Sequence, residues 1–217
     1  ISKQWKIKEV VLETKPSVTP KFDTFHKIER DMYEFEVSTW FENSPPKWEQ
    51  LFPVRRLGNI NELGISKDIR LLETDVIFVF GTGILKEQIL NHIQAPILNF
   101  HGGDPRYYRG LDTNLWAIYH REYEKVCACL HFVEPKIDAG AIVSLKWIDV
   151  LALPHIAGMR TKITEACVML AKEYLSNFEK TPSIKPIPLT KLGRYYSFMP
   201  ACLKQLCLDN FYSKKGI

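Results

Sequence analysis

Short apolar runs alternate along this chain with longer stretches in which apolar residues recur every three or four positions. The first pattern is typical of buried strands and the second of amphipathic helices, so their alternation predicts an α/β protein. Asp75 to Phe80, DVIFVF, is the clearest strand, because a continuous β-branched and aromatic run fits a parallel strand covered on both faces. The other expected strands are Lys6 to Thr14, Val54 to Leu57, Pro96 to Leu98, Lys125 to Val133 and Ala141 to Val150.

Helices are expected between these strands. A long one is predicted from Pro154 to about Phe178, with proline at an early helical position where its missing N–H costs nothing. Its apolar stripe is expected to join the core, and comprises Ile156, Met159, Ile163, Cys167, Leu170 and Tyr174. The other helical stretches are a helix-rich insertion in Thr19 to Trp40, Ile60 to Leu72, a helix after Leu85 ending at His92, and Thr113 to Tyr123.

Composition and charge narrow the class of protein. The 217 residues are 46% apolar and 25% charged, which is ordinary for a globular domain, and the net charge of +4 is too small and dispersed to favour nucleic acid. No apolar run approaches the roughly 20 residues that cross a bilayer, and no signal peptide is visible, so no membrane partner and a cytoplasmic location are expected. The five cysteines, without a C-x-x-C pair, indicate buried thiols in a reducing compartment and no zinc site.

Candidate chemistry begins at the end of the strand Pro96 to Leu98. Asn99 and His101 stand two residues apart, so both side chains leave one face of the strand. The loop that follows, Gly102 to Gly110, contains an Asp-Pro step and ends in Tyr-Arg-Gly. On position alone such a polar pair is more often a cap or a satisfied surface pair than a catalytic one.

Asp138 changes this interpretation. It lies in the segment HFVEPKIDAGAIV, 37 residues after His101, where an aspartate would otherwise be read as a turn cap. Asn-x-His, the Tyr-Arg-Gly loop and HFV…IDAG together resemble the folate-dependent formyltransferases, from about Asp75 to Val143. That family includes glycinamide ribonucleotide transformylase, methionyl-tRNA formyltransferase and the N-formyltransferases of nucleotide-linked amino sugars. One departure is the loop after His101, where the family usually has Pro-Ser-Leu-Leu-Pro and this chain has Gly-Gly-Asp-Pro.

The resemblance implies a doubly wound, mostly parallel, Rossmann-like sheet. No βα unit precedes the first strand, so the sheet is expected to lack its first βα unit and the numbering to begin within a longer protein. Residues 1–150 are expected to form the catalytic α/β domain, with an insertion at about 19–50. Residues 151–217 would be a C-terminal helix and tail packed on that domain.

The resemblance also implies a site. It suggests that 10-formyltetrahydrofolate donates a formyl group to a primary amine, with Asn99 stabilising the carbonyl oxygen, His101 donating or relaying a proton and Asp138 orienting the imidazole. The other five histidines are expected to be surface or core residues. Pterin-binding residues are expected at Phe80, Gly81, Gly83, Ile84, Leu85, Leu90, Glu134, Pro135 and Ile137, with backbone groups reading the ring edge. Acceptor-side residues are expected at Gly103, Asp104 and Arg109, although Arg109 would equally serve to pin the loop.

Other functions fit the sequence less well. A nicotinamide oxidoreductase is disfavoured because no G-x-G-x-x-G opens a helix, whereas a catalytically inactive folate-binding relative stays open as an alternative. The tail is too short for the tRNA-binding barrel of methionyl-tRNA formyltransferase, and the loop departs from the glycinamide ribonucleotide pattern. The favoured acceptor is therefore a nucleotide-linked amino sugar, with another small amine as the alternative. No metal is called for, and a homodimer is one expected assembly.

Overall fold

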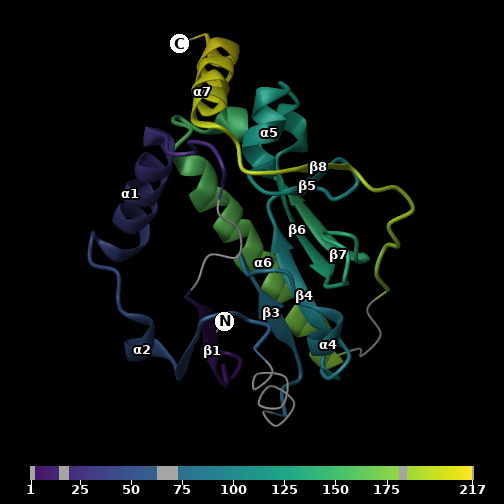
Figure 1. Cartoon of the computed structure of the whole chain (residues 1–217). Helices are drawn as coiled ribbons and strands as arrows, with labels where there is room; N and C mark the ends of the chain where they lie inside the picture. Colours follow the sequence, from purple (N-terminus) through teal and green to yellow (C-terminus); the bar gives the residue numbers. More distant parts are fainter. Residues whose placement is uncertain (1–2, 15–19, 63–72, 181–184, 217) are drawn as a thin grey trace.

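The computed structural model describes residues 3–14, 20–62, 73–180 and 185–216. Figure 1 shows strands at the centre, the long helix α6 running along them, and α5 and α7 together at one end. The strands are β1 (Val10–Glu13), β2 (Val54–Leu57), β3 (Ile77–Val79), β4 (Ile97–His101), β5 (Tyr108–Gly110), β6 (Cys127–Phe132), β7 (Ile142–Trp147) and β8 (Arg194–Tyr196). The helices are α1 (Lys27–Phe41), α2 (Trp48–Leu51), α4 (Glu87–Leu90), α5 (Thr113–Tyr119), α6 (Gly158–Lys180) and α7 (Ala201–Lys215), with 3₁₀ turns η1 (Tyr123–Lys125) and η2 (Val150–Ala152).

The main sheet is mixed and has the order β3-β4-β6-β7. β3 and β4 are parallel, while β6 runs antiparallel to both β4 and β7. Two further pairs are parallel: β1 with β2, and β5 with β8. The predicted α/β class is confirmed, with parallel pairing in β1–β2, β3–β4 and β5–β8 and antiparallel neighbours on both sides of β6.

The two faces of β4 point into different cores, as strand alternation requires. Leu98, fully buried, packs with Leu130 of β6 against Leu170 of α6. Ile97, on the opposite face, packs with Ile89 of α4 and with the β1–β2 pair. Asn99 and His101 share the face of Ile97, and this parity fixes where the candidate site can form.

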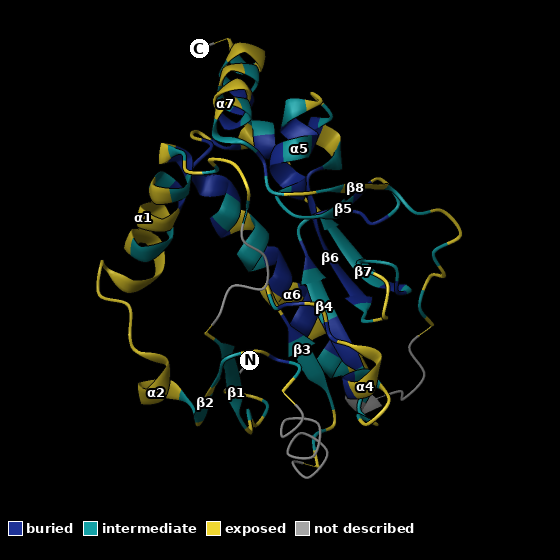
Figure 2. Ribbon diagram, viewed as in Figure 1, coloured by how far each residue is buried: buried dark blue, intermediate teal, exposed yellow. Residues whose placement is uncertain are grey.

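The ends of α6 differ from the sequence expectation. The helix begins at Gly158 and not at Pro154, because the residues between them form a turn in which His155 Nδ1 accepts the Ala157 N–H. The predicted stripe is confirmed: five of its six residues are buried and the sixth, Ile163, is partly buried. Figure 2 shows this burial along α6 and β6, in contrast to the exposed surfaces of α1 and α2.

Other boundaries also moved. The helix expected from Thr113 to Tyr123 stops at Tyr119 and is followed by η1, and the helix ending at His92 reduces to one turn, α4. Most of the helix expected at Ile60 to Leu72 lies outside the described residues. The carboxyl-terminal tail was expected only as an aromatic and lysine-rich segment, but it forms β8 and α7.

A third apolar cluster holds the carboxyl-terminal tail against the rest of the protein. Met199, Cys207 and Phe211 are all fully buried against α5, η2 and the start of α1. All five cysteines are free thiols; four are buried as predicted, and Cys202 is exposed. None of the described helices combines the length and the apolarity needed to cross a membrane.

Candidate active site

The candidate active site lies at the β4–β6 boundary, where the antiparallel register pairs Asn99 with His131. Directly opposed residues of neighbouring strands project from the same face, so His131 joins Asn99 and His101. Asn99 Nδ2 lies 3.1 Å from His131 Nε2. His131 was expected to be a surface or core residue; it is buried, but it also has polar neighbours in Asn99 and Asp138, which the sequence did not predict.

Asp138 completes the cluster from the turn after β6. Its Oδ1 lies 3.5 Å from His131 Nε2 and its Oδ2 lies 3.7 Å from His101 Nδ1. The structure therefore brings together the three residues predicted from the sequence, with His131 as the link between Asn99 and Asp138. We refer to Asn99, His101, His131 and Asp138 as the polar cluster.

The backbone holds Asp138 in an uncommon conformation. Its φ is +46°, in the left-handed region that aspartate tolerates better than most residues. Oδ2 accepts the Gly110 N–H at 2.7 Å, while the Arg109 side chain donates from Nη1 to the Ile137 carbonyl and from Nε to the Gly193 carbonyl, both at 3.0 Å. The Tyr-Arg-Gly segment thus fixes the aspartate turn from the side of β5.

Hydrogen bonds to carbonyl groups define the two imidazole tautomers. His131 Nδ1 lies 2.8 Å from the Phe132 carbonyl, which can only accept, so Nδ1 carries hydrogen. Nε2 faces both Asn99 Nδ2 and Asp138 Oδ1: in the neutral ring it accepts from the amide, and in the protonated ring it donates to the carboxylate. In the same way His101 Nε2 donates to the Tyr108 carbonyl at 3.0 Å, which turns Nδ1 toward Asp138.

Burial and the charge of the partner residue shift the pKa of His101 in opposite directions, and they do the same for the pKa of Asp138. Burial lowers the pKa of His101 below its ordinary value, although the Asp138 carboxylate partly opposes this. Burial acts to raise the pKa of Asp138, but the hydrogen bond with His131, the charge of His101 and the Gly110 N–H outweigh it and lower that pKa overall. Burial therefore opposes the charged form of His101, while the neighbours of Asp138 favour its ionised form.

A cavity of about 100 Å³ opens beside the cluster. Among the residues predicted to bind the cofactor, those that line it are Gly83, Ile84, Leu85, Glu134 and Ile137. Three members of the polar cluster line it as well: Asn99, His131 and Asp138. The predicted cofactor loop therefore meets two of the three predicted catalytic residues, Asn99 and Asp138, at one cavity.

The remaining predicted site residues lie around this cavity without lining it. His101 is 6% exposed and lies behind Asp138, and Leu90, the last residue of α4, is partly buried against the apolar cluster around Ile89 and Ile97. Gly81 has a φ of +62° and open space around it, and Phe80 is 67% exposed. Pro135 is also exposed.

The loop from Gly83 to Leu85 is held by two side chains, Glu13 at the end of β1 and Asn61 after β2. Glu13, the last residue of β1, accepts the Gly83 N–H at 2.8 Å with one carboxylate oxygen and the Ile60 N–H at 3.0 Å with the other. Asn61 donates to the Ile84 carbonyl at 2.7 Å. The Gly83 N–H, expected to read a pterin edge, thus donates within the protein.

The glycine-rich loop after His101 is internally bonded. Asp104 is fully buried and accepts from Arg106 through Nε and Nη2, with distances from 2.6 to 2.9 Å. A carbon atom added to Gly103 would lie 3.1 Å from Thr113 Cβ, so a larger residue would crowd α5. Thr113 Oγ1 donates to the Gly102 carbonyl at 2.7 Å, which fastens the loop to the same helix.

Comparison with solved structures gives this arrangement a context. A sugar N-formyltransferase from a Shewanella species superposes with a TM-score of 0.58 at 13% identity, covering 86% of this chain and 84% of its own. The formyltransferase PseJ from Anoxybacillus kamchatkensis, solved with a UDP-linked formamido sugar and tetrahydrofolate, gives 0.56 at 18% identity over 87% and 85%. The chain has the formyltransferase fold. HypX from Aquifex aeolicus in complex with tetrahydrofolic acid has the same fold over 96% of this chain, with a TM-score of 0.58 at 18% identity.

Curated relatives point the same way. Methionyl-tRNA formyltransferase of Leptospira interrogans is 25% identical over 119 residues, and that of Sulfurimonas denitrificans is 28% identical over 120 residues. The matches cover 53% and 54% of this chain, and 36% and 39% of those relatives. No protein-family model matches. The resemblance to the folate-dependent formyltransferases is confirmed, and the chain spans little more than a third of the length of these curated relatives.

Proposed function

We propose that the chain transfers a formyl group from 10-formyltetrahydrofolate to the primary amine of a nucleotide-linked sugar. The observation that carries the proposal is the single cavity at which the Gly83–Leu85 loop meets Asn99, His131 and Asp138. A folate-binding loop and a formyl-transfer cluster must adjoin in this way for the formyl carbon to reach the polar groups.

The cavity accounts for part of the cofactor. At about 100 Å³ it is smaller than the ~300–1,000 Å³ of sites that enclose a whole drug-sized ligand. In the proposal the formyl-bearing end enters the cavity, and the rest of the folate lies across the exposed side chains of Ile84 and Glu134. The complexes of PseJ and HypX with tetrahydrofolate support a folate as the donor.

The chemistry follows from the cluster. The neutral amine attacks the formyl carbon, a new C–N bond forms and the carbonyl oxygen becomes an oxyanion. The Asn99 amide carries two N–H groups, so one can donate to His131 while the second donates to the oxyanion. His131 thereby fixes which end of the amide faces the cavity.

Protons must then move from the attacking nitrogen to the leaving folate nitrogen as the old C–N bond breaks. The Asp138 carboxylate lies near both imidazoles and would stabilise either ring in its protonated, positively charged form. His131 lines the cavity, so the geometry favours it over His101 for direct contact with the reacting atoms, and His101 supports Asp138 from behind.

The acceptor is inferred from the relatives. PseJ and the Shewanella enzyme superpose over 85% and 84% of their own length with TM-scores of 0.56 and 0.58, against 72% and 0.50 for methionyl-tRNA formyltransferase from Clostridium thermocellum, and this difference favours the sugar. Gly103, Asp104 and Arg109 would border the acceptor. Asp104 and Arg109 would act there mainly by shaping the loop and the aspartate turn, since their charged groups are engaged with Arg106 and with backbone carbonyls.

The test is an assay with 10-formyltetrahydrofolate and three acceptors: a thymidine-diphosphate 4-amino sugar, glycinamide ribonucleotide and methionyl-tRNA. We expect the sugar to gain one formyl group by mass spectrometry and the Asp138→Asn variant to lose at least about a hundredfold in rate. Preferential use of glycinamide ribonucleotide would refute the sugar assignment but keep formyl transfer. Folate binding without transfer to any amine would support an inactive relative.

A further inference from the structure

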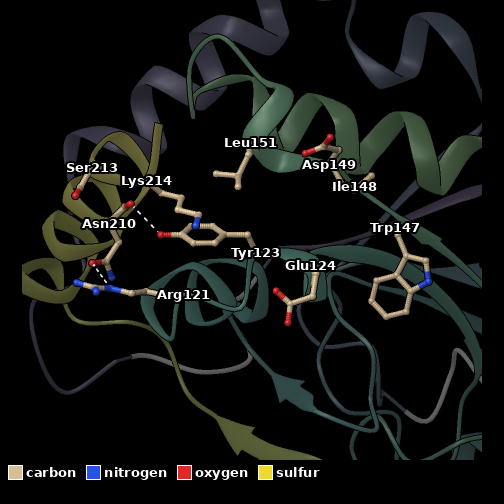
Figure 3. Close-up of a pocket in the computed structure, with 10 residues that line it drawn as sticks. All are labelled: Arg121, Tyr123, Glu124, Trp147, Ile148, Asp149, Leu151, Asn210, Ser213 and Lys214. Carbon is tan, nitrogen blue, oxygen red and sulfur yellow. Dashed lines mark hydrogen bonds between the residues drawn. The ribbon is translucent and has the colours of Figure 1, made fainter. Parts of the chain in front are cut away.

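A second cavity, of about 770 Å³, shares no lining residue with the first. It lies between η1, the end of β7, η2 and α7, and its size is within the range of small-molecule sites. Figure 3 shows its lining, which comprises Arg121, Tyr123, Glu124, Trp147, Ile148, Asp149, Leu151, Asn210, Ser213 and Lys214.

One end of this second cavity is basic. Arg121 and Lys214 lie there beside Asn210 (Figure 3). Arg121 is held in place at two points: its backbone is in the left-handed region with φ +62°, and its Nε donates to Asn210 Oδ1 at 3.1 Å. Asn210 is itself fixed, because its Nδ2 donates to the Tyr119 carbonyl at 3.0 Å. This hydrogen bond directs the guanidinium toward Asn210 at the edge of the second cavity.

The opposite end is aromatic and is bordered by acids. The Trp147 side chain is half exposed at the end of β7, and Figure 3 shows Glu124 between it and Arg121. Asp149 lies on the adjoining wall, where one of its oxygens caps η2 by accepting the Ala152 N–H. The cavity therefore has the Trp147 indole at one end and the cationic Arg121 and Lys214 at the other, and its lining also includes two carboxylates.

Three of these side chains, Trp147, Lys214 and Glu124, have no hydrogen-bond or ion-pair partner among the described residues. In the part of the chain that the structure describes, neither the Lys214 nor the Glu124 side chain forms an ion pair or hydrogen bond. Over the same residues the Trp147 indole N–H donates to no acceptor. An exposed tryptophan beside unpaired charges of both signs is a common composition for a ligand site, since each group keeps its capacity for an external partner.

We propose that this cavity binds a nucleoside phosphate. The base would stack on Trp147, the sugar hydroxyls or base N–H groups would donate to Glu124 and Asp149, and the phosphate would accept from Arg121 and Lys214. A simple anion would make no use of the tryptophan and would be repelled by the carboxylates. A purely apolar ligand would displace water from these exposed charged side chains without replacing its hydrogen bonds. The proposal is independent of the proposed formyl transfer.

The test is titration of GDP and ADP into the full chain, followed by calorimetry and by quenching of tryptophan fluorescence. We expect saturable binding that Trp147→Ala and Lys214→Ala each weaken by about tenfold, the value of one lost charge-assisted or stacking contact. Trp48→Ala and Lys172→Ala are the matched controls, since both residues are exposed on other helices and should leave affinity unchanged. Guanosine and inorganic phosphate, tested singly, should each bind more weakly than GDP.

A nucleotide that entered the polar cluster instead would give a different pattern. Asn99→Ala, titrated in parallel, should keep its affinity for GDP if the second cavity is the site. The proposal is overturned if wild type shows no binding at millimolar GDP, or if Asn99→Ala loses binding that Trp147→Ala retains. Formyl transfer by Trp147→Ala reports on the proposed function separately, so failure of one inference does not imply failure of the other.

Discussion

At the scale of single residues, His131 carries more of the site than its place in the sequence suggests. It accepts from Asn99, lies 3.5 Å from Asp138 and is anchored by the Phe132 carbonyl. A ring fixed on one nitrogen and shared between an amide and a carboxylate on the other can both orient Asn99 and move a proton. These two roles can be separated by substitution.

We predict that His131→Ala lowers kcat by about a hundredfold, because the Asn99 amide loses the partner that orients it. His131→Gln should recover part of this loss, since a glutamine oxygen can accept from Asn99 but cannot carry a proton. The measurement is steady-state formyl transfer with both variants, with His92→Ala, an exposed histidine, as the control. Wild-type rates in both His131 variants would exclude either role.

The buried His101 makes a prediction about stability and pH. Its pKa is lowered in the folded state from an ordinary value of 6.5, so between these two values the unfolded chain binds a proton that the folded chain does not. Stability is therefore complete above about pH 6.5 and declines as the pH falls toward the folded pKa. Asp138 adds no slope in this window, because its own pKa is lowered from 3.8.

We expect urea unfolding to show wild type losing stability between about pH 7.5 and pH 5.5, and His101→Gln losing less over the same interval. A steeper decline in the variant than in wild type would contradict the direction of the His101 shift.

At the scale of elements, the loop after β3 depends on β1. Glu13 accepts the Gly83 and Ile60 N–H groups, so one carboxylate fixes a cavity-lining residue and the segment beside Asn61 together. We predict that Glu13→Gln raises the dissociation constant for tetrahydrofolate by about tenfold, because the amide nitrogen cannot accept the second N–H. At saturating folate, kcat should change little.

Equilibrium binding and kinetics together test this role of Glu13. Glu34→Gln, an exposed substitution on α1, controls for the loss of one negative charge. A fall in kcat with unchanged folate affinity would place the effect of Glu13 on the reacting groups and not on the loop.

At the scale of the whole molecule, the carboxyl-terminal tail is connected to the site because β8 pairs with β5, whose last residue, Gly110, bonds Asp138. Gly110 gives its N–H to Asp138 and lies against the Tyr196 carbonyl, where an added Cβ would come within 2.0 Å. Its φ of +92° adds backbone strain for any other residue. The contact between β5 and β8 at Gly110 therefore has room only for glycine.

We predict that Gly110→Ala costs at least about 3 kcal/mol in unfolding free energy, from steric overlap added to strain. Gly81→Ala is the matched control, because Gly81 also has a positive φ of +62° but has open space around it, and should cost only about 1 kcal/mol. Equal losses in the two variants, measured by denaturant titration, would mean that the Tyr196 contact contributes nothing.

The sequence predicted well the features that depend on local spacing, namely which face of a strand or helix a side chain occupies. Strand parity placed Asn99 and His101 on one face, and the apolar stripe of α6 was confirmed because helical spacing alone decides it. His131 was missed because its role depends on the antiparallel register of β4 and β6, which no local pattern contains. The alternation in CACLHF offered the one available signal: if Leu130 faces the core, His131 faces the other way.

The tail escaped prediction for a related reason. β8 has only three residues, and its partner β5 lies 86 residues earlier in the pairing of Tyr108 with Arg194. Pairings this distant depend on tertiary packing, here the burial of Met199 and Phe211, and not on the propensity of the segment.

The link between Gly110 and Tyr196 also bears on how the protein is made. A ribosome releases the polar cluster, residues 99 to 138, well before it synthesises the segment that packs against Gly110. Arg109 cannot bond the Gly193 carbonyl, nor Asp112 the Met199 N–H, until that segment has emerged. The nascent chain must therefore carry these residues without their final contacts until residues 193 to 199 are available for packing. Chains interrupted in that interval would hold every residue of the cluster and still lack the geometry that makes them a site.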